Sequence, residues 1–238
     1  MIKLFGFGPQ FGVPDPSPFV MKVDAYLRMT GIEFKFEPGI DNLRKAPKGK
    51  LPFIEDDGEV IADSFFIIEH LRQKYHPTLD QWLSEEQRAI MNLIIKSLDE
   101  NFNWCLVYSR WLCDDTWPTL KAAFFGGLPF PAKQIAPIIV RRRIRTALIK
   151  QGMGRHNDRE IMQIAQHTVD SLSGLLNDKH YLLGSQPCTL DATAYAFLAQ
   201  LVLVDLDNPL NRLAARYDNL VDYCRRINRR YYSPHGSA

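Results

Sequence analysis

The chain has 238 residues, of which 46% are hydrophobic and 24% are charged, and its formal net charge is +2. This length allows one large domain or two small ones, and the composition is ordinary for a globular protein. The small net charge excludes a strong overall attraction to nucleic acid or acidic lipid, and no apolar run approaches the roughly 18 residues of a membrane span.

The beginning of the chain predicts a strand, a helix and a second strand. Residues 2–7 are a short apolar run, and a Pro/Gly-rich loop follows over residues 8–16. Ser17-Pro18 is typical of a helix N-terminus, because serine caps a free N–H and proline has none to lose there. The helix is expected to end at Gly31, before an alternating strand, and this order predicts a right-handed parallel crossover.

A β-hairpin and a further helix are predicted next. Proline cannot donate to a sheet ladder, so Leu51-Pro52 is expected at the start of a strand. An Asp-Gly pair at residues 57–58 lies between two apolar runs, which is the strongest short hairpin signal. Asp63-Ser64 then precedes an apolar pattern at helical spacing, so it is expected to begin a helix.

The hydrophobic pattern divides the chain in two. Residues 1–76 are predicted to form one α/β domain, residues 77–83 a linker, and residues 84–238 an all-helical domain. Ser84 begins a capping box, with a glutamine three residues later. Helices of the second domain are expected at about residues 84–113, 118–125, 133–150, 157–177, 192–204 and 220–230.

The hairpin region resembles the glutathione-binding half of a glutathione S-transferase. The resemblance rests on Leu51-Pro52 ahead of the hairpin and on Asp63-Ser64 at the next helix. It implies the fold class of an α/β thioredoxin-like N-terminal domain plus an all-α C-terminal domain. In this family the proline is cis, and the residue before it, here Leu51, offers its backbone N–H and C=O to the cysteinyl part of glutathione.

The second half of the chain is also similar to this superfamily. Gly184, followed by Thr-Leu-Asp-Ala at residues 189–192 and an apolar helix, resembles the family's capping-box and hydrophobic-staple signal. Cys188 replaces the usual Ser or Thr of that signal. The signal as a whole is interpreted as structural, with no part in catalysis or binding. The segments most similar to the failed-axon-connections type, which is allied to metaxins, are residues 17–19 with Lys22 and residues 27–28, residues 100–104 with 108–111, and residues 152–156.

The resemblance implies that Asp63 and Ser64 hold the γ-glutamyl end of glutathione at a helix N-terminus. The other interpretation of these two residues is a helix cap, which both residue types favour. Lys50, with Lys48 beside it, is expected to add positive charge toward a glutathione carboxylate, or else to be a solvated loop lysine. Glutathione is thus the expected co-substrate. No metal is expected, because the histidines have no partner at ligand spacing.

Ser17 occupies, by resemblance, the place of the family's catalytic serine or cysteine. The glutathione thiol has a pKa of about 8.5 to 9, so a transferase must favour the thiolate. A hydroxyl that donates to sulfur does so, as does the positive end of a helix. The alternative is that Ser17 only caps the helix. Residues 1–76 contain no cysteine, so this domain cannot itself form a mixed disulfide with glutathione.

Three aromatic residues of the long helix are candidates for an acceptor pocket. Trp104, Tyr108 and Trp111 recur at i, i+4 and i+7, which places them on one helix face. In the family that helix borders the site, so these side chains are expected to line a pocket for an apolar electrophile. Asn103 and Arg110 are further candidates for the same cleft. The competing interpretation is that the aromatic residues belong to the core or to a dimer interface.

The function implied by the resemblance is a glutathione S-transferase that activates the glutathione thiol for attack on a hydrophobic electrophile or peroxide, as in detoxification. The alternative is a non-catalytic binding or structural module, and a third hypothesis is a reductase that uses a distant cysteine such as Cys105.

The family implies a homodimer. Four cysteines without CxxC or metal spacing indicate a reduced, cytoplasmic compartment. The basic clusters at residues 141–145 and 225–230 are interpreted as solvated faces, so no nucleic-acid partner is expected.

Overall fold

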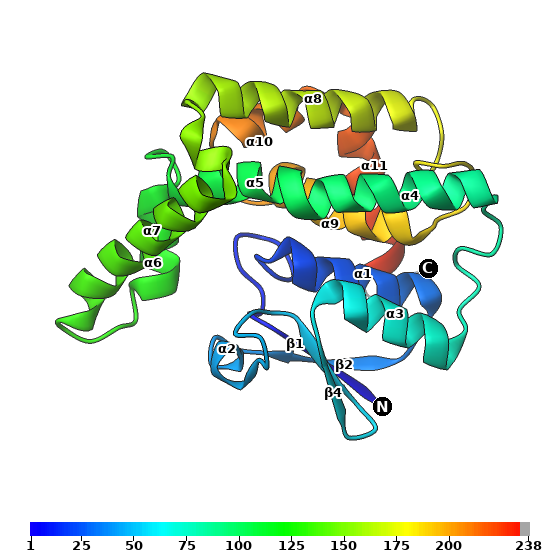
Figure 1. The fold of residues 1–238 in the computed structure, drawn as a ribbon, viewed down its shortest axis with the longest axis horizontal. Helices are drawn as coiled ribbons and strands as arrows, with labels where there is room; N and C mark the ends of the chain where they lie inside the picture. The colour runs from blue at the N-terminus through cyan, green and yellow to red at the C-terminus, as the bar shows by residue number, and fades with distance from the viewer. Residues whose placement is uncertain (234–238) are drawn as a thin grey trace.

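The structure, a computed structural model, describes residues 1–233 and consists of a sheet-containing half and a helical half (Figure 1). The sheet-containing half begins at the N-terminus and has the predicted α/β character. Its elements are, in order, β1 (Ile2–Gly6), α1 (Pro18–Thr30), β2 (Phe34–Pro38), α2 (Asn42–Lys45), β3 (Phe53–Asp56), β4 (Glu59–Ala62) and α3 (Ser64–Tyr75).

The strands form one mixed sheet in the order β2-β1-β3-β4. β1 pairs in parallel with β2, with Ile2 opposite Phe34, as the strand–helix–strand pattern predicts. β1 is antiparallel to β3, and β3 pairs antiparallel with β4 across the turn at Asp57 and Gly58. Both turn residues have positive φ, 49° and 85°, which matches the two left-handed positions of a type I′ hairpin turn.

Local signals determine both ends of α1. Ser17 is its N-cap, and the Ser17 Oγ accepts a hydrogen bond from the backbone N–H of Val20. Pro18 follows at the first helical position. Gly31 ends the helix with a φ of 69°, a left-handed conformation that glycine adopts at little cost. The predicted start and end of this helix are confirmed.

The second half of the described chain is helical. Its elements are α4 (Glu85–Ser97), the π-helix η1 (Leu98–Phe102), α5 (Asn103–Trp111), α6 (Trp117–Phe125), α7 (Ala132–Gln151), the 3-10 turn η2 (Met153–Arg155), α8 (Asp158–Leu176), α9 (Thr189–Val202), α10 (Pro209–Ala214) and α11 (Asp218–Tyr231). The predicted capping box at Ser84 is present. Residues 234–238, the end of the predicted C-terminal domain, lie outside the described residues.

Two short helices and one irregular turn depart from the sequence prediction. The helices α2 and α10 have four and six residues, which are too few for a helical pattern to be recognised in the sequence. The long helix predicted over residues 84–113 is interrupted by η1, which lies between α4 and α5. A π-helical turn between two α-helical segments is frequent at functional sites.

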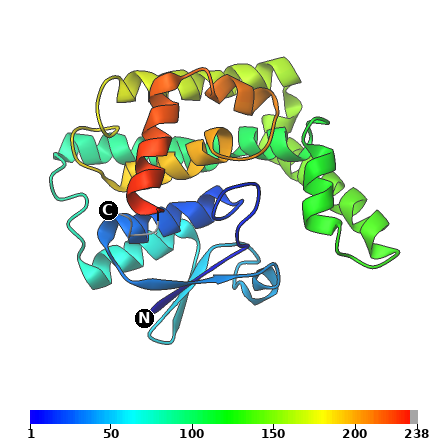
Figure 2. The same cartoon turned by 180° about the vertical axis from the view of Figure 1, so that it is seen from behind.

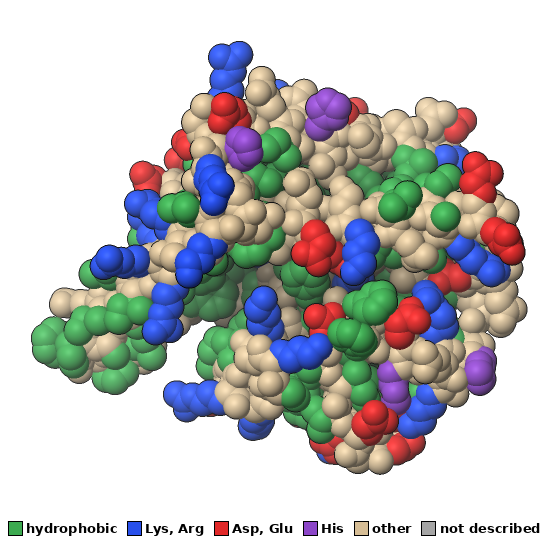
Figure 3. Space-filling view, viewed as in Figure 1, with side chains coloured by type: hydrophobic (Ala, Val, Ile, Leu, Met, Phe, Trp, Pro, Cys, Tyr) green, Lys and Arg blue, Asp and Glu red, His purple; other side chains and the backbone are tan. Residues whose placement is uncertain are grey.

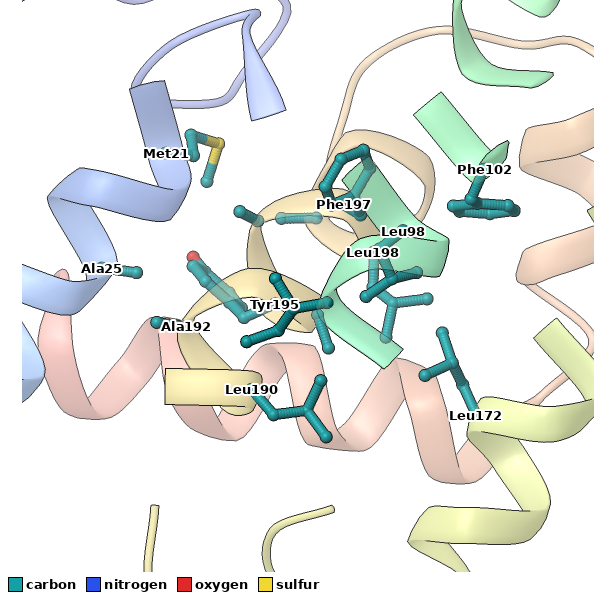
Figure 4. Close-up of a cluster of buried hydrophobic side chains, with 14 of the residues drawn as sticks. Met21, Ala25, Leu98, Phe102, Leu172, Leu190, Ala192, Tyr195, Phe197 and Leu198 are labelled. Atoms are coloured by element: carbon teal, nitrogen blue, oxygen red, sulfur yellow. The ribbon is translucent and has the colours of Figure 1, made fainter. Parts of the chain in front are cut away.

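The two halves share one hydrophobic core. α1 and α3 lie on the side of the sheet that is turned toward the helical half, and α1 packs against α9 (Figure 1). Figure 4 shows part of this core, in which Met21 and Ala25 of α1 lie beside Tyr195 and Ala192 of α9. All four side chains are buried. Because partners surround α9, its sequence is apolar around nearly the whole helix.

One part of the helical half projects from the body of the molecule. α6, α7 and the loop between them, residues 117–151, form an arm that extends away from the other helices in both views (Figure 1 and Figure 2). At the base of the arm the Trp111 ring stacks on Phe124, with 5.6 Å between centroids, and Arg141 lies over Trp117. Within residues 1–233, no helix combines the length and the apolar character needed to cross a membrane.

Candidate functional site

A cleft of about 540 Å³ opens between the two halves. The loop before β3, the beginning of α1 and the beginning of α3 line it from one side, and the segment α4–η1–α5 lines it from the other. The lining residues are Phe19, Lys48, Lys50, Leu51, Pro52, Asp63, Ser64, Phe65, Phe66, Lys96, Asp99, Glu100, Asn103 and Trp104.

Most of the predicted binding residues lie together in this cleft. They are Lys50, Leu51, Pro52, Asp63, Ser64 and Trp104. The peptide bond between Leu51 and Pro52 is cis. The backbone N–H of Asp63 donates to the carbonyl of Pro52 across 3.4 Å, so the hairpin brings the proline segment and the start of α3 into direct contact.

The start of α3 presents a helix N-terminus to the cleft. Asp63 is the N-cap, and its Oδ1 accepts a hydrogen bond from the backbone N–H of Phe65 at 3.0 Å. Asp63 has a φ of 86°, a conformation that is costly for a residue other than glycine and that clusters at ligand-binding sites. Ser64, the first residue of α3, is buried in the cleft wall. The positive end of this helix dipole therefore favours a bound carboxylate.

Three lysines give the cleft positive charge from both halves. Lys48 and Lys50 come from the loop before β3, and Lys96 comes from α4. The ammonium groups of Lys48 and Lys96 lie over the rings of Phe66 and Phe65, at 4.4 and 4.7 Å from the centroids. Cation–π contact of this kind attracts a lysine head group while leaving it accessible to water. Because three acidic residues share the lining with these lysines, the cleft can attract both carboxylates and an ammonium group.

A buried ion pair joins the two halves at the cleft. The Lys22 ammonium of α1 donates to Asp99 Oδ2 of η1 at 2.7 Å, and the two side chains are only 2% and 9% exposed. Burial lowers the pKa of Lys22 and raises the pKa of Asp99, against the mutual attraction of the pair. Asp99 lines the cleft, and its Oδ1 has no hydrogen-bond partner among the described residues. This buried oxygen is therefore an unsatisfied acceptor in the wall of the cleft.

Ser17 is half-buried at the start of α1 and is not part of the cleft lining. Phe19, two residues further along the chain, does line the cleft. The Ser17 Oγ accepts from the N–H of Val20 at 3.4 Å, and the Ser17 N–H donates to Asp15 Oδ1 at 2.8 Å. The helix cap is therefore present. Because accepting a hydrogen bond uses an oxygen lone pair, the hydroxyl proton of Ser17 is still free to donate. Capping and thiolate stabilisation are compatible roles for this residue.

Asp15 has no role in the sequence prediction, yet it holds the loop before α1 in place. Its carboxylate accepts hydrogen bonds from the backbone N–H groups of Phe7 at 2.7 Å, of Gly8 at 3.0 Å and of Ser17 at 2.8 Å. The side chain is buried. In the sequence Asp15 lies between two prolines in a loop, where an aspartate usually indicates only a turn. Through these bonds Asp15 positions the backbone of Ser17.

The ionisation of Asp15 is expected to lower the free energy of unfolding by about 4 kcal/mol as the pH rises from about 4 to about 7. Burial raises the pKa of Asp15 to about 7, although the N–H groups of Gly8, Ser17 and Phe7 favour the carboxylate. An unfolded aspartate has a pKa of about 3.9, so between these two values only the folded protein holds the proton.

Urea unfolding across this pH range, in the wild type and in Asp15→Asn, measures the effect. The asparagine cannot titrate. As the pH rises, the free energy of unfolding of the wild type should therefore fall steadily relative to that of the variant. The same pH dependence in both proteins would contradict the assignment.

Two buried side chains of the helical half hold the same loop. The Arg110 guanidinium of α5 donates from Nη1 to the carbonyl of Pro16 at 2.5 Å, and from Nη2 to Gln200 of α9. The Gln200 amide in turn donates to the carbonyl of Asp15 at 2.8 Å. Arg110 does not line the cleft, contrary to the expectation from the sequence, whereas Asn103 does. The arginine acts on the site through the loop that it positions.

Tyr108 and Trp111 lie outside the cleft lining, although they share a helix with Trp104. The Tyr108 hydroxyl donates to Asp158 at the start of α8, and Trp111 packs at the base of the arm. Of the three aromatic residues, the structure brings Trp104 alone into this cleft. Helical spacing identifies a common face, but α8 and the arm cover the C-terminal part of that face.

The cysteines do not supply a reactive thiolate. Cys105 is buried, and burial raises the pKa of its thiol to about 12, which disagrees with a reductase that uses Cys105. All four cysteines are free. Over residues 1–233, no group of His, Cys, Asp and Glu side chains is arranged to hold a metal ion.

The thioredoxin-like sheet with its cis-proline, the adjoining N-terminus of α3 and the helical half define a protein of glutathione transferase fold. Models of the glutathione S-transferase N-terminal domain and the glutathione S-transferase C-terminal domain match residues 18–117 and 165–227. The chain belongs to the glutathione S-transferase superfamily, which confirms the family and the fold class predicted from the sequence.

Individual relatives support this assignment. Isoprene-epoxide–glutathione S-transferase of Rhodococcus sp. (strain AD45) is 35% identical, over 97% of this chain and 99% of its own. Failed axon connections of Drosophila melanogaster is 30% identical over 95% of this chain, and the match spans 57% of that protein. Metaxin-2 of Homo sapiens is 24% identical, over 92% of this chain and 83% of its own. The predicted similarity to the failed-axon-connections and metaxin type is therefore confirmed.

Solved structures show the same fold. A glutathione S-transferase from Methylobacterium radiotolerans, in complex with glutathione sulfonate, matches with a TM-score of 0.60. The match covers 100% of this chain and 98% of that chain, at 16% sequence identity. At this identity the likeness demonstrates the fold alone.

Proposed function

We propose that this protein binds glutathione in the cleft and transfers it to a small hydrophobic electrophile such as an epoxide. The observation that carries the proposal is the meeting, in one cleft, of the cis-proline segment, the helix N-terminus at Asp63 and Ser64, and three lysines. The 35% identical Rhodococcus relative is named as a glutathione transferase for isoprene epoxide, which supports the same chemistry here.

The charges of the cleft complement those of glutathione, which carries two carboxylates and one ammonium group. The backbone N–H groups at the start of α3 would bind the γ-glutamyl carboxylate, and the Asp99 carboxylate would attract the neighbouring ammonium group. Lys48 and Lys50 would attract the glycine carboxylate. The backbone of Leu51 would pair with the central cysteinyl residue. Trp104 supplies apolar surface for the second substrate.

Ser17 would stabilise the reactive form of glutathione. Its hydroxyl proton donates to the sulfur, and the N-terminus of α1 adds favourable dipole charge, so both effects lower the pKa of the bound thiol. The thiolate then attacks an epoxide carbon. A C–S bond forms, the C–O bond to that carbon breaks, and the resulting alkoxide takes a proton from water. Ser17 keeps its own proton throughout.

Replacing Ser17 by alanine is expected to lower kcat/KM about a hundredfold, a loss comparable to that of one donor to a developing anion. Thiolate absorbance of bound glutathione, titrated across pH, should show the pKa of the thiol returning toward its free value. Turnover is measured with a small epoxide. Binding of glutathione, followed by calorimetry, should change little, because Ser17 is outside the cleft lining.

Two matched variants separate catalysis from helix capping. Ser17→Thr keeps both the hydroxyl and the cap, so it should retain the thiolate signal. Ser17→Gly keeps most of the capping stability but has no hydroxyl, so it should lose the signal as alanine does. If alanine, glycine and threonine variants all turn over like the wild type, Ser17 is a cap only.

The second candidate function is a glutathione-binding module without catalysis. The observation that favours it is the position of Ser17 outside the cleft lining. Binding heat with glutathione, together with turnover no faster than the uncatalysed reaction for several epoxides and peroxides, would establish this alternative. A lack of binding heat would exclude both functions.

We also propose that the protein is a homodimer. Large apolar side chains are exposed on neighbouring elements of the two halves, namely Val60 of β4, Phe66 of α3, and Ile90 and Leu93 of α4. An apolar surface of this kind is typical of a contact between subunits. Light scattering coupled to size-exclusion chromatography measures the oligomeric state.

A further inference from the structure

The positive charge of the chain is concentrated in the arm, residues 117–151. This segment holds seven of the 29 Lys and Arg residues and none of the 27 Asp and Glu residues. The arm therefore carries a formal charge of +7, and the rest of the chain carries −5. The net charge of the whole chain, from which no attraction to acidic lipid was expected, conceals a strongly basic element.

Most of these charges are free to meet a partner. Arg141 is the exception, because it binds Asp114 and the carbonyls of Trp111 and Leu112. The remaining basic side chains of the arm form no ion pair within residues 1–233, and all of them are exposed. They are Lys121, Lys133, Arg142, Arg143, Arg145 and Lys150.

The arm also exposes large apolar side chains. Phe130, in the loop, is 79% exposed, and Ile138 of α7 is 69% exposed. Ile135 and Ile139 are exposed too and, with Ile138, follow the i, i+3, i+4 spacing of one helix face. Figure 3 shows hydrophobic side chains covering the projecting end of the arm, with Lys and Arg side chains along its length. A continuous apolar patch on a protein surface usually marks a binding surface.

The basic residues border this apolar stripe. At about 100° per residue, Arg142 continues the stripe one turn beyond Ile138, while Arg143 and Arg145 lie on opposite sides of it. Arginine can lay its aliphatic stem along an apolar surface and keep its charged head in a polar layer. An apolar helix face bordered by cations is the pattern of helices that lie at a membrane interface.

We propose that the arm docks on the surface of an anionic lipid bilayer. The loop around Phe130 and the stripe of α7 would enter the boundary of the hydrocarbon, and the arginines would meet lipid phosphates. This inference concerns a surface apart from the cleft and does not depend on the proposed transferase activity.

A second copy of the chain fits the arm less well. A symmetric contact between two arms would bring together two surfaces that each carry a formal charge of +7, and their repulsion opposes association. A contact between the arm of one copy and the acidic remainder of another would be head-to-tail, and such contacts give open chains unless the rotation closes. A bilayer offers a continuous negative surface above an apolar interior, so it satisfies both properties of the arm at once.

Co-sedimentation of the full chain with vesicles tests the proposal. Vesicles of phosphatidylcholine with about 30% phosphatidylserine should bind the protein, whereas pure phosphatidylcholine should bind it at least about tenfold more weakly. The apolar variant Phe130→Ser/Ile138→Ser and the charge variant Arg142→Gln/Arg143→Gln/Arg145→Gln should each weaken binding at least about tenfold. High salt should weaken the wild type as well.

Matched controls remove the same groups from other faces. Ile40→Ser removes an apolar side chain that is 55% exposed and lies outside both the arm and the proposed dimer contact, and it should bind vesicles like the wild type. Arg216→Gln/Arg225→Gln/Arg229→Gln removes three exposed charges of the α10–α11 region, again with little effect. Circular dichroism checks that every variant is folded.

Three outcomes would overturn the proposal. The first is no binding to the anionic vesicles. The second is equal loss of binding in the arm variants and in their matched controls. The third is a change of oligomeric state in the apolar arm variant while vesicle binding is unaffected, which would assign the arm to a contact between copies.

Discussion

Replacing Lys22 by methionine is expected to lower the free energy of unfolding by about 3–5 kcal/mol, the usual cost of removing one partner of a buried ion pair. The Lys22 ammonium is 2.7 Å from Asp99 Oδ2, and both side chains are almost fully buried. Without the lysine, Asp99 would remain as an uncompensated charge between the two halves. Urea unfolding followed by circular dichroism measures the change in free energy.

The double variant Lys22→Met/Asp99→Leu provides the control for this prediction. Two apolar side chains of similar volume bury no charge, so stability should return to within about 1–2 kcal/mol of the wild type. Burial already shifts the pKa of Lys22 down and that of Asp99 up, which indicates that desolvation outweighs much of the attraction between them. A double variant as unstable as Lys22→Met would show that the lysine acts through its packing instead.

Replacing Arg110 by methionine is expected to lower the free energy of unfolding by about 3–5 kcal/mol. The Arg110 side chain is buried, and the substitution leaves the carbonyl of Pro16 and the side chain of Gln200 without their donor. Burial lowers the pKa of Arg110 to about 10, which still leaves it charged at neutral pH. Because this arginine holds the loop before α1, the backbone at Ser17 should also shift.

Activity and stability together test the role of Arg110. If it positions the loop, Arg110→Met should lower kcat with epoxide more than it changes glutathione affinity, at a temperature where the variant is still folded. The control is Arg212→Met, which removes an exposed arginine paired with Asp115 and Asp207 and should change neither property appreciably. Unchanged kcat in a folded Arg110→Met protein would limit this arginine to stability.

Both buried networks cross from one half of the protein to the other beside the cleft. Lys22 of α1 reaches Asp99 of η1, and the loop before α1 is held by Arg110 of α5 and Gln200 of α9. Buried polar contacts are costly unless satisfied, and Asp99 Oδ1 and Arg110 Nε lack partners within the described part of the chain. Stability is thus reduced where a ligand site is formed, which is common at functional sites.

The candidate site divides into a part that the sequence predicts and a part that it does not. Leu51, Pro52, Asp63 and Ser64 belong to a recognisable local pattern of hairpin and helix start, and the structure brings them together. Trp104 follows from its position on the helix that borders the cleft. Lys22 belongs to the segment that resembles the failed-axon-connections type, but nothing in the sequence pairs it with Asp99, which looks like an ordinary charged residue of a surface helix.

The sequence by itself determined the elements whose boundaries depend on neighbours a few residues away. The serine cap and glycine end of α1, the Asp57-Gly58 turn and the Ser84 capping box are all made within a few positions of the chain, so residue type alone predicts them. The parallel pairing of β1 and β2 followed from the general rule for strand–helix–strand units.

Only the tertiary structure decided which distant side chains meet. Lys22 and Asp99 are 77 residues apart, Pro16 and Arg110 are 94 apart, and Asp15 and Gln200 are 185 apart. Helical periodicity states which residues share a face, but the partner of that face depends on how the helices pack. For the same reason, the sequence alone does not show that the seven basic residues of the arm form a separate surface. They do so because α6 and α7 project from the body of the molecule (Figure 1).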